Sequence, residues 1–337
     1  QGHFSLAYFR NILANPATRT AMANSCWLSL STTLVTALIA IPLAFLTTRF
    51  RFPGKILLTG LLMVPMIMPP FVGAIGMRQL LARFGSVNLL LMEAGLIDLP
   101  IDWLGSARFW GVVIVEALHL YPIFYLNASA ALANVDPALE EAALNLGSNR
   151  LRTFIRVTLP LMTPGLFAGA ILVMLWSFTD LGTPLIFEYR NVLAVQIFDR
   201  TTDLADNPEG HALVVLVLAI TTVIFLTSKK FFGVKGYETL GKGSTQATEK
   251  ALSKVGGVLA VLALSGVVLL ACLPHLAVIL TSIREKWFMT VLPESYTFLY
   301  YEKALGHNLT LSSIKNSILL ASLSTMLDII LGVTIAY

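Results

Sequence analysis

Three ionisable side chains fall within long apolar runs of this chain, and their types could serve proton transfer or the passage of a solute. Glu116 and His119 lie one helical turn apart in VEALHLYP, and Asp180 follows LWSFT. An ionisable side chain at the centre of a bilayer costs about 2.5–3.5 kcal/mol on insertion scales, so such groups usually face the protein interior or water. We therefore expect Asp180 to line or gate a solute path, with Glu116 and His119 as further candidates. The residues after Asp180 are expected to share its role: Gly182, Thr183 and Pro184.

Two other interpretations of these side chains stay open. They could form hydrogen bonds or ion pairs between helices without touching a solute, which also applies to Arg78. They could instead serve an intramembrane enzyme built on Glu116, His119 and Asp180, but the sequence reveals neither a third convergent ligand nor a substrate pocket. Glu116 and His119 alone do not make a metal-ligand set. We therefore expect no catalytic residues and no metal site.

The elements that position these groups are expected to be membrane spans. Hydrophobic residues make up 56% of the chain and charged residues 12%, against about 25% charged in soluble domains. Helices are expected because lipid leaves no partner for backbone polar groups, and the runs lack the alternation of barrel strands. The sequence predicts an all-α, polytopic membrane helical bundle of about seven transmembrane helices: Ser25–Leu46, Ile56–Ala82, Phe109–Leu132, Pro164–Phe187, His211–Ser228, Val255–Ile283 and Ser312–Tyr337.

The charges of the loops predict how these spans are oriented. Lys and Arg are enriched in short cytoplasmic loops. One alternating set of loops is basic, around residues 49–55, 150–156 and 229–254, and the other set is longer and richer in Asp and Glu. The basic loops are therefore expected in the cytoplasm. Because topology accounts for the net charge of +4, that charge does not indicate nucleic acid as a partner.

One of the basic loops, DPALEEAALNLGSNRLRTFIRVTLP (136–160), contains residues that are typical of helix starts and helix ends. Asp136 before Pro137 is typical of a helix start, and Gly147 is typical of a helix stop. Ser148 is then expected to cap a second helix that ends at Pro160. The segment therefore predicts two short helices at the membrane surface, exposing a narrow face of small residues to another protein. The alternatives are an amphipathic linker in the lipid interface and a DNA-binding helix-turn-helix, which the flanking spans would keep from any duplex.

This segment resembles the EAA loop of the permease subunits of bacterial ABC importers. The family pattern is Glu-Ala-Ala, three residues, Gly, nine residues, Ile, one residue and Leu-Pro. The matching residues are Glu141, Ala142, Ala143, Gly147, Leu159 and Pro160, and Val157 stands in place of Ile. The resemblance implies a type I ABC importer permease fold and a loop that docks on a cytoplasmic ATPase. RFRFPGK and SFTDLGTPLIF are most similar to permeases of the ferric-iron type.

The resemblance also implies partners. These are a cytoplasmic ABC ATPase dimer, a periplasmic solute-binding protein, the lipid bilayer and a second permease unit, in the same longer chain or another copy. ATP and Mg²⁺ would bind the ATPase, so no cofactor is expected on this chain. Ferric iron is the favoured solute, while aminoethylphosphonate, thiamine, polyamine and sulfate stay open. The bacterial inner membrane is the expected location.

An internal repeat suggests how the chain is divided. NSCWLSLSTTLVTALIAIPLAF (24–45) aligns without a gap on NSILLASLSTMLDIILGVTIAY (316–337). Repeats of this kind are common in transporters. We expect a periplasmic segment over 1–24, a first permease unit over 25–232, a cytoplasmic linker over 233–254 and an incomplete second unit over 255–337. We interpret the chain as an internal piece of a longer two-unit permease.

Overall fold

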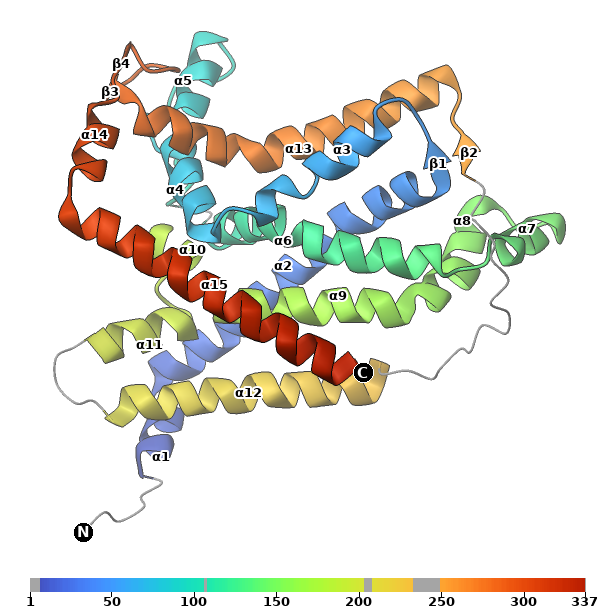
Figure 1. The fold of residues 1–337 in the computed structure, drawn as a ribbon, viewed down its shortest axis with the longest axis horizontal. Helices are drawn as coiled ribbons and strands as arrows, with labels where there is room; N and C mark the ends of the chain where they lie inside the picture. Colours follow the sequence, from blue (N-terminus) through green and yellow to red (C-terminus); the bar gives the residue numbers. More distant parts are fainter. Residues whose placement is uncertain (1–6, 106–107, 203–207, 233–248, 337) are drawn as a thin grey trace.

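The computed structural model describes residues 7–105, 108–202, 208–232 and 249–336, and it is a bundle of long helices (Figure 1). Six helical segments are long and apolar enough to cross a membrane. They are α2 (Pro16–Arg49), α6 (Arg108–Ala133), the continuous run Arg150–Thr179, α12 (Pro208–Phe232), α13 (Lys254–Ser282) and α15 (Asn308–Ala336). These segments confirm the helical membrane fold predicted from the apolar runs. The linker residues 233–248 lie outside the described part of the chain.

The predicted span Ile56–Ala82 is a broken helix pair. Its two legs, Lys55–Met66 and Pro70–Glu93, meet at 93°. The first leg comprises α3 (Lys55–Leu61) and the 3₁₀ turn η1 (Val64–Met66), and the second comprises α4 (Pro70–Leu81) and α5 (Ser86–Glu93). The break falls within MVPMIMPP, where prolines remove backbone donors and crowd the preceding turn. The kink or break that these prolines predict is confirmed, and with this pair the number of spans rises to as many as seven.

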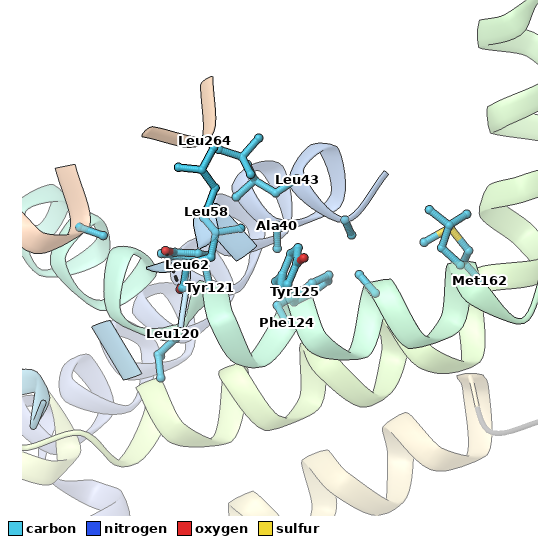
Figure 2. Close-up of a cluster of buried hydrophobic side chains, with 14 of the residues drawn as sticks. Ala40, Leu43, Leu58, Leu62, Leu120, Tyr121, Phe124, Tyr125, Met162 and Leu264 are labelled. Carbon is cyan, nitrogen blue, oxygen red and sulfur yellow. Dashed lines mark hydrogen bonds between the residues drawn. The ribbon is translucent and has the colours of Figure 1, made fainter. Parts of the chain in front are cut away.

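The centre of the bundle is formed by α2, α6 and α9 (Leu159–Thr179). Small residues let these helices approach closely, as is usual where helices pack in membranes. Gly169 of α9 lies against Phe124 and Asn127 of α6, and Gly165 lies against Ala131. Figure 2 shows the cluster of buried side chains around α6, drawn also from α2, the α3 region, α9 and α13: Ala40, Leu43, Leu58, Leu62, Leu120, Tyr121, Phe124, Tyr125, Met162 and Leu264.

The shorter elements gather at the two ends of the bundle (Figure 1). At the end that carries the basic loops, called here the basic end, lie α7 (Pro137–Asn145), α8 (Arg150–Thr153) and the parallel pair β1 (Phe50–Arg51) and β2 (Lys250–Ala251). The opposite end holds the antiparallel pair β3 (Arg284–Lys286) and β4 (Ser295–Tyr296), with α14 (Leu299–Leu305) close by. The remaining short helices are α1 (Ala7–Ala14), α10 (Gly182–Ile186) and α11 (Leu193–Thr202). In the described part of the chain, these two short strand pairs are an addition to the predicted all-α fold.

The two copies of the internal repeat have the same local structure in different surroundings. Both form long helices, α2 and α15, which agrees with their aligned sequences. α2 is packed between α6 and α9, whereas none of the most apolar stretch of α15 is buried. α13 packs along α4 and α3 of the preceding bundle. The division into two permease units stays a prediction.

Candidate functional site

The first helix of the predicted docking loop begins and ends where its sequence indicates. The Asp136 side chain accepts a hydrogen bond from the Ala138 amide (2.9 Å), and Pro137 is the first residue of α7. Gly147 has a φ of +87°, in the left-handed region that favours glycine, and it turns the chain just after α7. The predicted helix with its glycine corner is therefore confirmed.

The second helix differs from its prediction at both ends. Asn149, not Ser148, is its cap, because its side-chain oxygen accepts the Arg152 amide (2.8 Å). Pro160 does not end the helix, since α8 continues through a π-helical turn, Phe154–Thr158, into α9. In this wide turn the Leu159 amide bonds to the Phe154 carbonyl, five residues back. Pro160 directly follows this π-helical turn and, having no N–H, donates no helical hydrogen bond of its own.

The loop presents an open surface at the basic end of the bundle. No residue of α7, all of which lies in the described part of the chain, is buried. Glu141, Ala142 and Gly147 are exposed, and Ala143 is half-buried. Exposed leucines border these residues: Leu139, Leu144, Leu146 and Leu151. Val157 and Leu159 are half-buried and Pro160 is exposed at the start of the span. The surface combines small, apolar and acidic residues, which suits close contact with another protein.

Two groups of contacts that the sequence did not predict hold this loop in place. Inside, Arg49 at the end of α2 donates to Glu140 Oε1 (3.0 Å) and to the Val135 carbonyl (3.2 Å). Thr158 Oγ1 donates to the same Glu140 oxygen (2.9 Å). The sequence signal for Glu140 was its place just before the EAA motif, but nothing in the sequence pointed to its partner 91 positions away.

The second group of contacts lies on the surface. Lys250 Nζ lies 3.3 Å from Glu141 Oε1, and Lys55 Nζ lies 2.6 Å from Glu249 Oε1. The parallel β1–β2 pair joins the segment after α2 to the segment before α13, the same two segments that Lys55 and Glu249 connect. The start of α13 is therefore attached beside the docking loop.

Within the membrane region, Glu116 is buried with 2% of its surface exposed. Its Oε2 accepts hydrogen bonds from Thr32 Oγ1 (3.1 Å) and from Ser177 Oγ. Its Oε1 has no hydrogen-bond partner among the described residues. The carboxyl group thus ties α6 to α2 and α9, which matches the interhelical alternative in the sequence analysis.

His119 lies one turn further along α6 and lines a narrow pocket with His275 of α13. His275 Nδ1 lies 3.0 Å from the Ala271 carbonyl, so this nitrogen is the donor and Nε2 carries a lone pair. His119 Nδ1 and His275 Nε2 have no hydrogen-bond partner in the described part of the chain. Gly73 of α4 leaves the space beside the His275 ring. Across the residues that the structure describes, no three His, Cys, Asp or Glu side chains converge to hold a metal.

Asp180 lies at the end of α9 away from the docking loop and begins a short helix. Its Oδ1 accepts the Gly182 amide (3.1 Å) and its Oδ2 accepts the Thr183 amide (3.2 Å), so it satisfies the first amides of α10 from the position before the N-cap, Leu181. Asp180 is half-buried, while Thr183 and Pro184 are buried. Asp180 therefore has a structural partner in this conformation, and its role in a solute path stays a prediction.

Arg78 is half-exposed rather than embedded in the bundle. It lies 3.1 Å from Glu188 Oε1, an ion pair of the kind that the alternative interpretation allowed. The structure consequently gives Glu116, Asp180 and Arg78 separate hydrogen-bond or ion-pair partners.

Comparison with known proteins finds membrane permease components by both the family model and the related sequences. The family model described as binding-protein-dependent transport system inner membrane component matches residues 28–232. The ferric transport system permease protein FbpB of Actinobacillus pleuropneumoniae is 30% identical over 226 residues, covering 65% of this chain and 32% of that protein. The molybdenum transport system permease protein ModB of Escherichia coli K12 is 32% identical over 164 residues, covering 48% of this chain and 69% of that protein. The chain thus spans about a third of the length of the ferric relative.

Among solved structures, the fold is similar to a bacterial alginate ABC transporter in complex with an alginate pentasaccharide-bound periplasmic protein. The TM-score is 0.56 at 19% identity, covering 67% of this chain and 82% of that chain. The likeness supports the helical permease fold.

Proposed function

We propose that this chain, which belongs to the family of binding-protein-dependent transport system inner membrane components, forms the membrane path of an ATP-driven importer. The observation that carries this proposal is the exposed loop of α7 and α8 with its EAA residues. A separate ATPase dimer would bind ATP and Mg²⁺ and dock on this loop. A periplasmic binding protein would deliver the solute at the opposite end. Family membership also identifies the chain as a multi-pass inner membrane transport component rather than an enzyme.

This proposal places the basic end of the bundle in the cytoplasm. Support comes from the three basic loops, which meet there through contacts between Lys250 and Glu141 and between Arg49 and Glu140. Their positive charge agrees with the bias of cytoplasmic loops. The EAA surface would then face the compartment that holds ATP.

The solute is the finer part of the proposal. A ferric and a molybdenum transport system permease have similar identity to this chain, so identity alone does not separate these two solutes. Ferric iron is proposed because the ferric relative is 30% identical over 65% of this chain, whereas a molybdenum relative of nearly equal coverage, 64%, is 27% identical. We further propose that a second permease unit completes the path. The exposed apolar surface of α15 supports this, since a bare span needs protein or lipid to cover it.

The test uses variants of the docking surface. Glu141→Lys reverses a charge on this surface, and Gly147→Val places a β-branched residue at a positive φ. Both are expected to reduce accumulation of the transported solute at least tenfold, at unchanged chain levels in the membrane. Lys229→Gln, an exposed change at the basic end on α12, is the matched control. Ferric citrate, molybdate and spermidine are the uptake probes.

Native mass spectrometry of the tagged protein from its own membranes gives a second measurement. The proposal expects two copies of an ATPase bound to the wild-type protein and a reduced share of bound ATPase for Glu141→Lys and Gly147→Val. Purification without any ATPase, together with unchanged uptake in both variants, would contradict the importer function.

A further inference from the structure

The α7 helix poses a mechanical problem. It is expected to move with the ATPase, yet none of its residues is buried, and all of them belong to the described part of the chain. Apolar packing therefore cannot hold it rigidly to the membrane helices. A displacement of α7 reaches the spans only through the chain itself or through polar contacts strong enough to resist separation.

Arg49 supplies such a contact. Its Nη2 donates at once to Glu140 Oε1 of α7 (3.0 Å) and to the Val135 carbonyl just before α7 (3.2 Å). Thr158 of the π-helical turn donates to the same Glu140 oxygen (2.9 Å). The Arg49 and Glu140 side chains are 9% and 18% exposed, so water screens the pair little. Arg49, Glu140 and Thr158 form a cluster, called here the Arg49 bracket, that joins α2, α7 and the start of α9.

We propose that Arg49 is a positioning residue for coupling, which holds α7 in a fixed orientation on α2 and α9 so that its movement reaches both spans. This inference rests on the proposed importer function. Arg49 is buried although its Nε and Nη1 have no hydrogen-bond partner among the described residues. The guanidinium is therefore held there by Glu140 and Val135 rather than by a full set of contacts.

A neighbouring arginine gives a matched control. Arg51 lies two residues along at the same end of α2 but is exposed, and Arg49 is 8% exposed. Arg49→Met keeps much of the apolar stem and removes every donor. Arg49→Lys keeps the charge with a single ammonium, so it is expected to restore part of the contact. Arg51→Met removes an equal charge outside the bracket.

The first measurement is a pair of spin-label distances in the purified membrane complex, in a background with Cys26 and Cys272 replaced by Ala. One label pair joins Asn145 of α7 to Leu38 of α2, and the other joins Leu38 to Leu126 of α6; all three positions are exposed. Arg49→Met is expected to broaden the α7–α2 distribution at least twofold and to leave the α2–α6 distribution unchanged.

Equal widths in wild type and Arg49→Met would overturn the inference. Broadening of both distributions would overturn it as well, because Arg49 would then merely support the fold.

The second measurement is uptake of whichever probe the wild type accumulates: ferric citrate, molybdate or spermidine. Arg49→Met is expected to lower uptake at least tenfold while ATPase still copurifies, Arg49→Lys to recover part of it, and Arg51→Met to stay within twofold of wild type. Wild-type uptake in Arg49→Met, with uptake lost in Glu141→Lys, would overturn this inference alone. Wild-type uptake in both would instead contradict the proposed function.

Discussion

The broken span contains a backbone carbonyl that the sequence itself leaves without a partner. Leu62 lies between α3 and η1, and the residue three positions later is Pro65, which has no N–H. The next amide, of Met66, bonds to Met63 instead. Tyr121 of α6 fills this gap, since its hydroxyl donates to the Leu62 carbonyl at 2.8 Å and its side chain is fully buried (Figure 2).

Tyr121→Phe should therefore leave a buried carbonyl unsatisfied. Such a loss costs about 1–3 kcal/mol of the free energy of unfolding. Tyr125→Phe, one turn along α6, is the matched control. Its hydroxyl pairs with Thr47 Oγ1 at 2.7 Å, but Thr47 also donates to the Leu43 carbonyl at 2.8 Å. The control should cost about 0.6 kcal/mol, the average for side-chain hydrogen bonds between membrane helices.

Equilibrium unfolding in mixed micelles of detergent and denaturant gives both free energies. The prediction is a loss for Tyr121→Phe at least twice that for Tyr125→Phe, with the helical content of the folded state unchanged. Equal losses in the two variants would refute the argument, because the proline break would then not create the demand for a hydroxyl donor.

Two further predictions concern helix packing. Gly76→Ala should destabilise the protein by about 1–3 kcal/mol, because the new Cβ would overlap a backbone carbonyl of α13, whereas Gly73→Ala should be tolerated at an ordinary 3.7 Å contact. Thermal stability in detergent compares the two, and an equal loss in both would contradict the packing. At Glu116, Thr32→Val and Ser177→Ala each leave one hydroxyl donor, while the double variant leaves none. A double-mutant cycle should show a coupling of at least about 0.5 kcal/mol, and additive losses would argue against a shared carboxylate.

Local signals in the sequence were enough for the existence of the spans, but α2 begins at Pro16 rather than Ser25, and the span predicted over Pro164–Phe187 is the run Arg150–Thr179. The apolar runs, the proline break before α4, the Asp136 cap and the Gly147 corner all depend on residues within a few positions of each other. The errors were local too. Asn149 and Ser148 are both good caps, and sequence alone does not decide between adjacent candidates. Pro160 is typical of a helix stop, but a π-helical turn, which leaves no clear sequence signature, lets the helix continue past it.

Contacts between elements far apart in the sequence could not be predicted from residue types and spacing. The partner of Glu140 is Arg49, and the partners of Glu116 lie on two other helices. These contacts depend on how the helices pack, not on spacing along the chain. The same limit applies to Asp180. The sequence predicts it in a solute path, and in the structure its side chain accepts the first amides of α10. A polar residue in an apolar run indicates that a partner exists, but the fold decides which one.

The position of Asp180 acquires a meaning once two helices are followed across the membrane: α9, which continues from the docking loop, and α2, which contacts the loop through Arg49. α9 continues from α8 through the π-helical turn and ends at Thr179, next to Asp180, whose side chain accepts the first amides of α10. α2 carries the Arg49 bracket at one end, and near the other end its Ser25 accepts the Leu193 amide at 2.9 Å. The rise from Ser25 to Arg49 is about 36 Å at 1.5 Å per residue, more than the roughly 30 Å of hydrocarbon.

Both helices are therefore long enough to cross the membrane, and both contact the segment between Asp180 and Leu193, α9 through the chain and α2 through Ser25. A displacement of α7 would reach that segment along α9 through the chain and along α2 through Arg49. Without the bracket, α2 loses its own polar link to α7, while α6 and α9 stay connected to α7 through the chain. In the proposed importer, the movement of α2 together with α9 would then depend on Arg49.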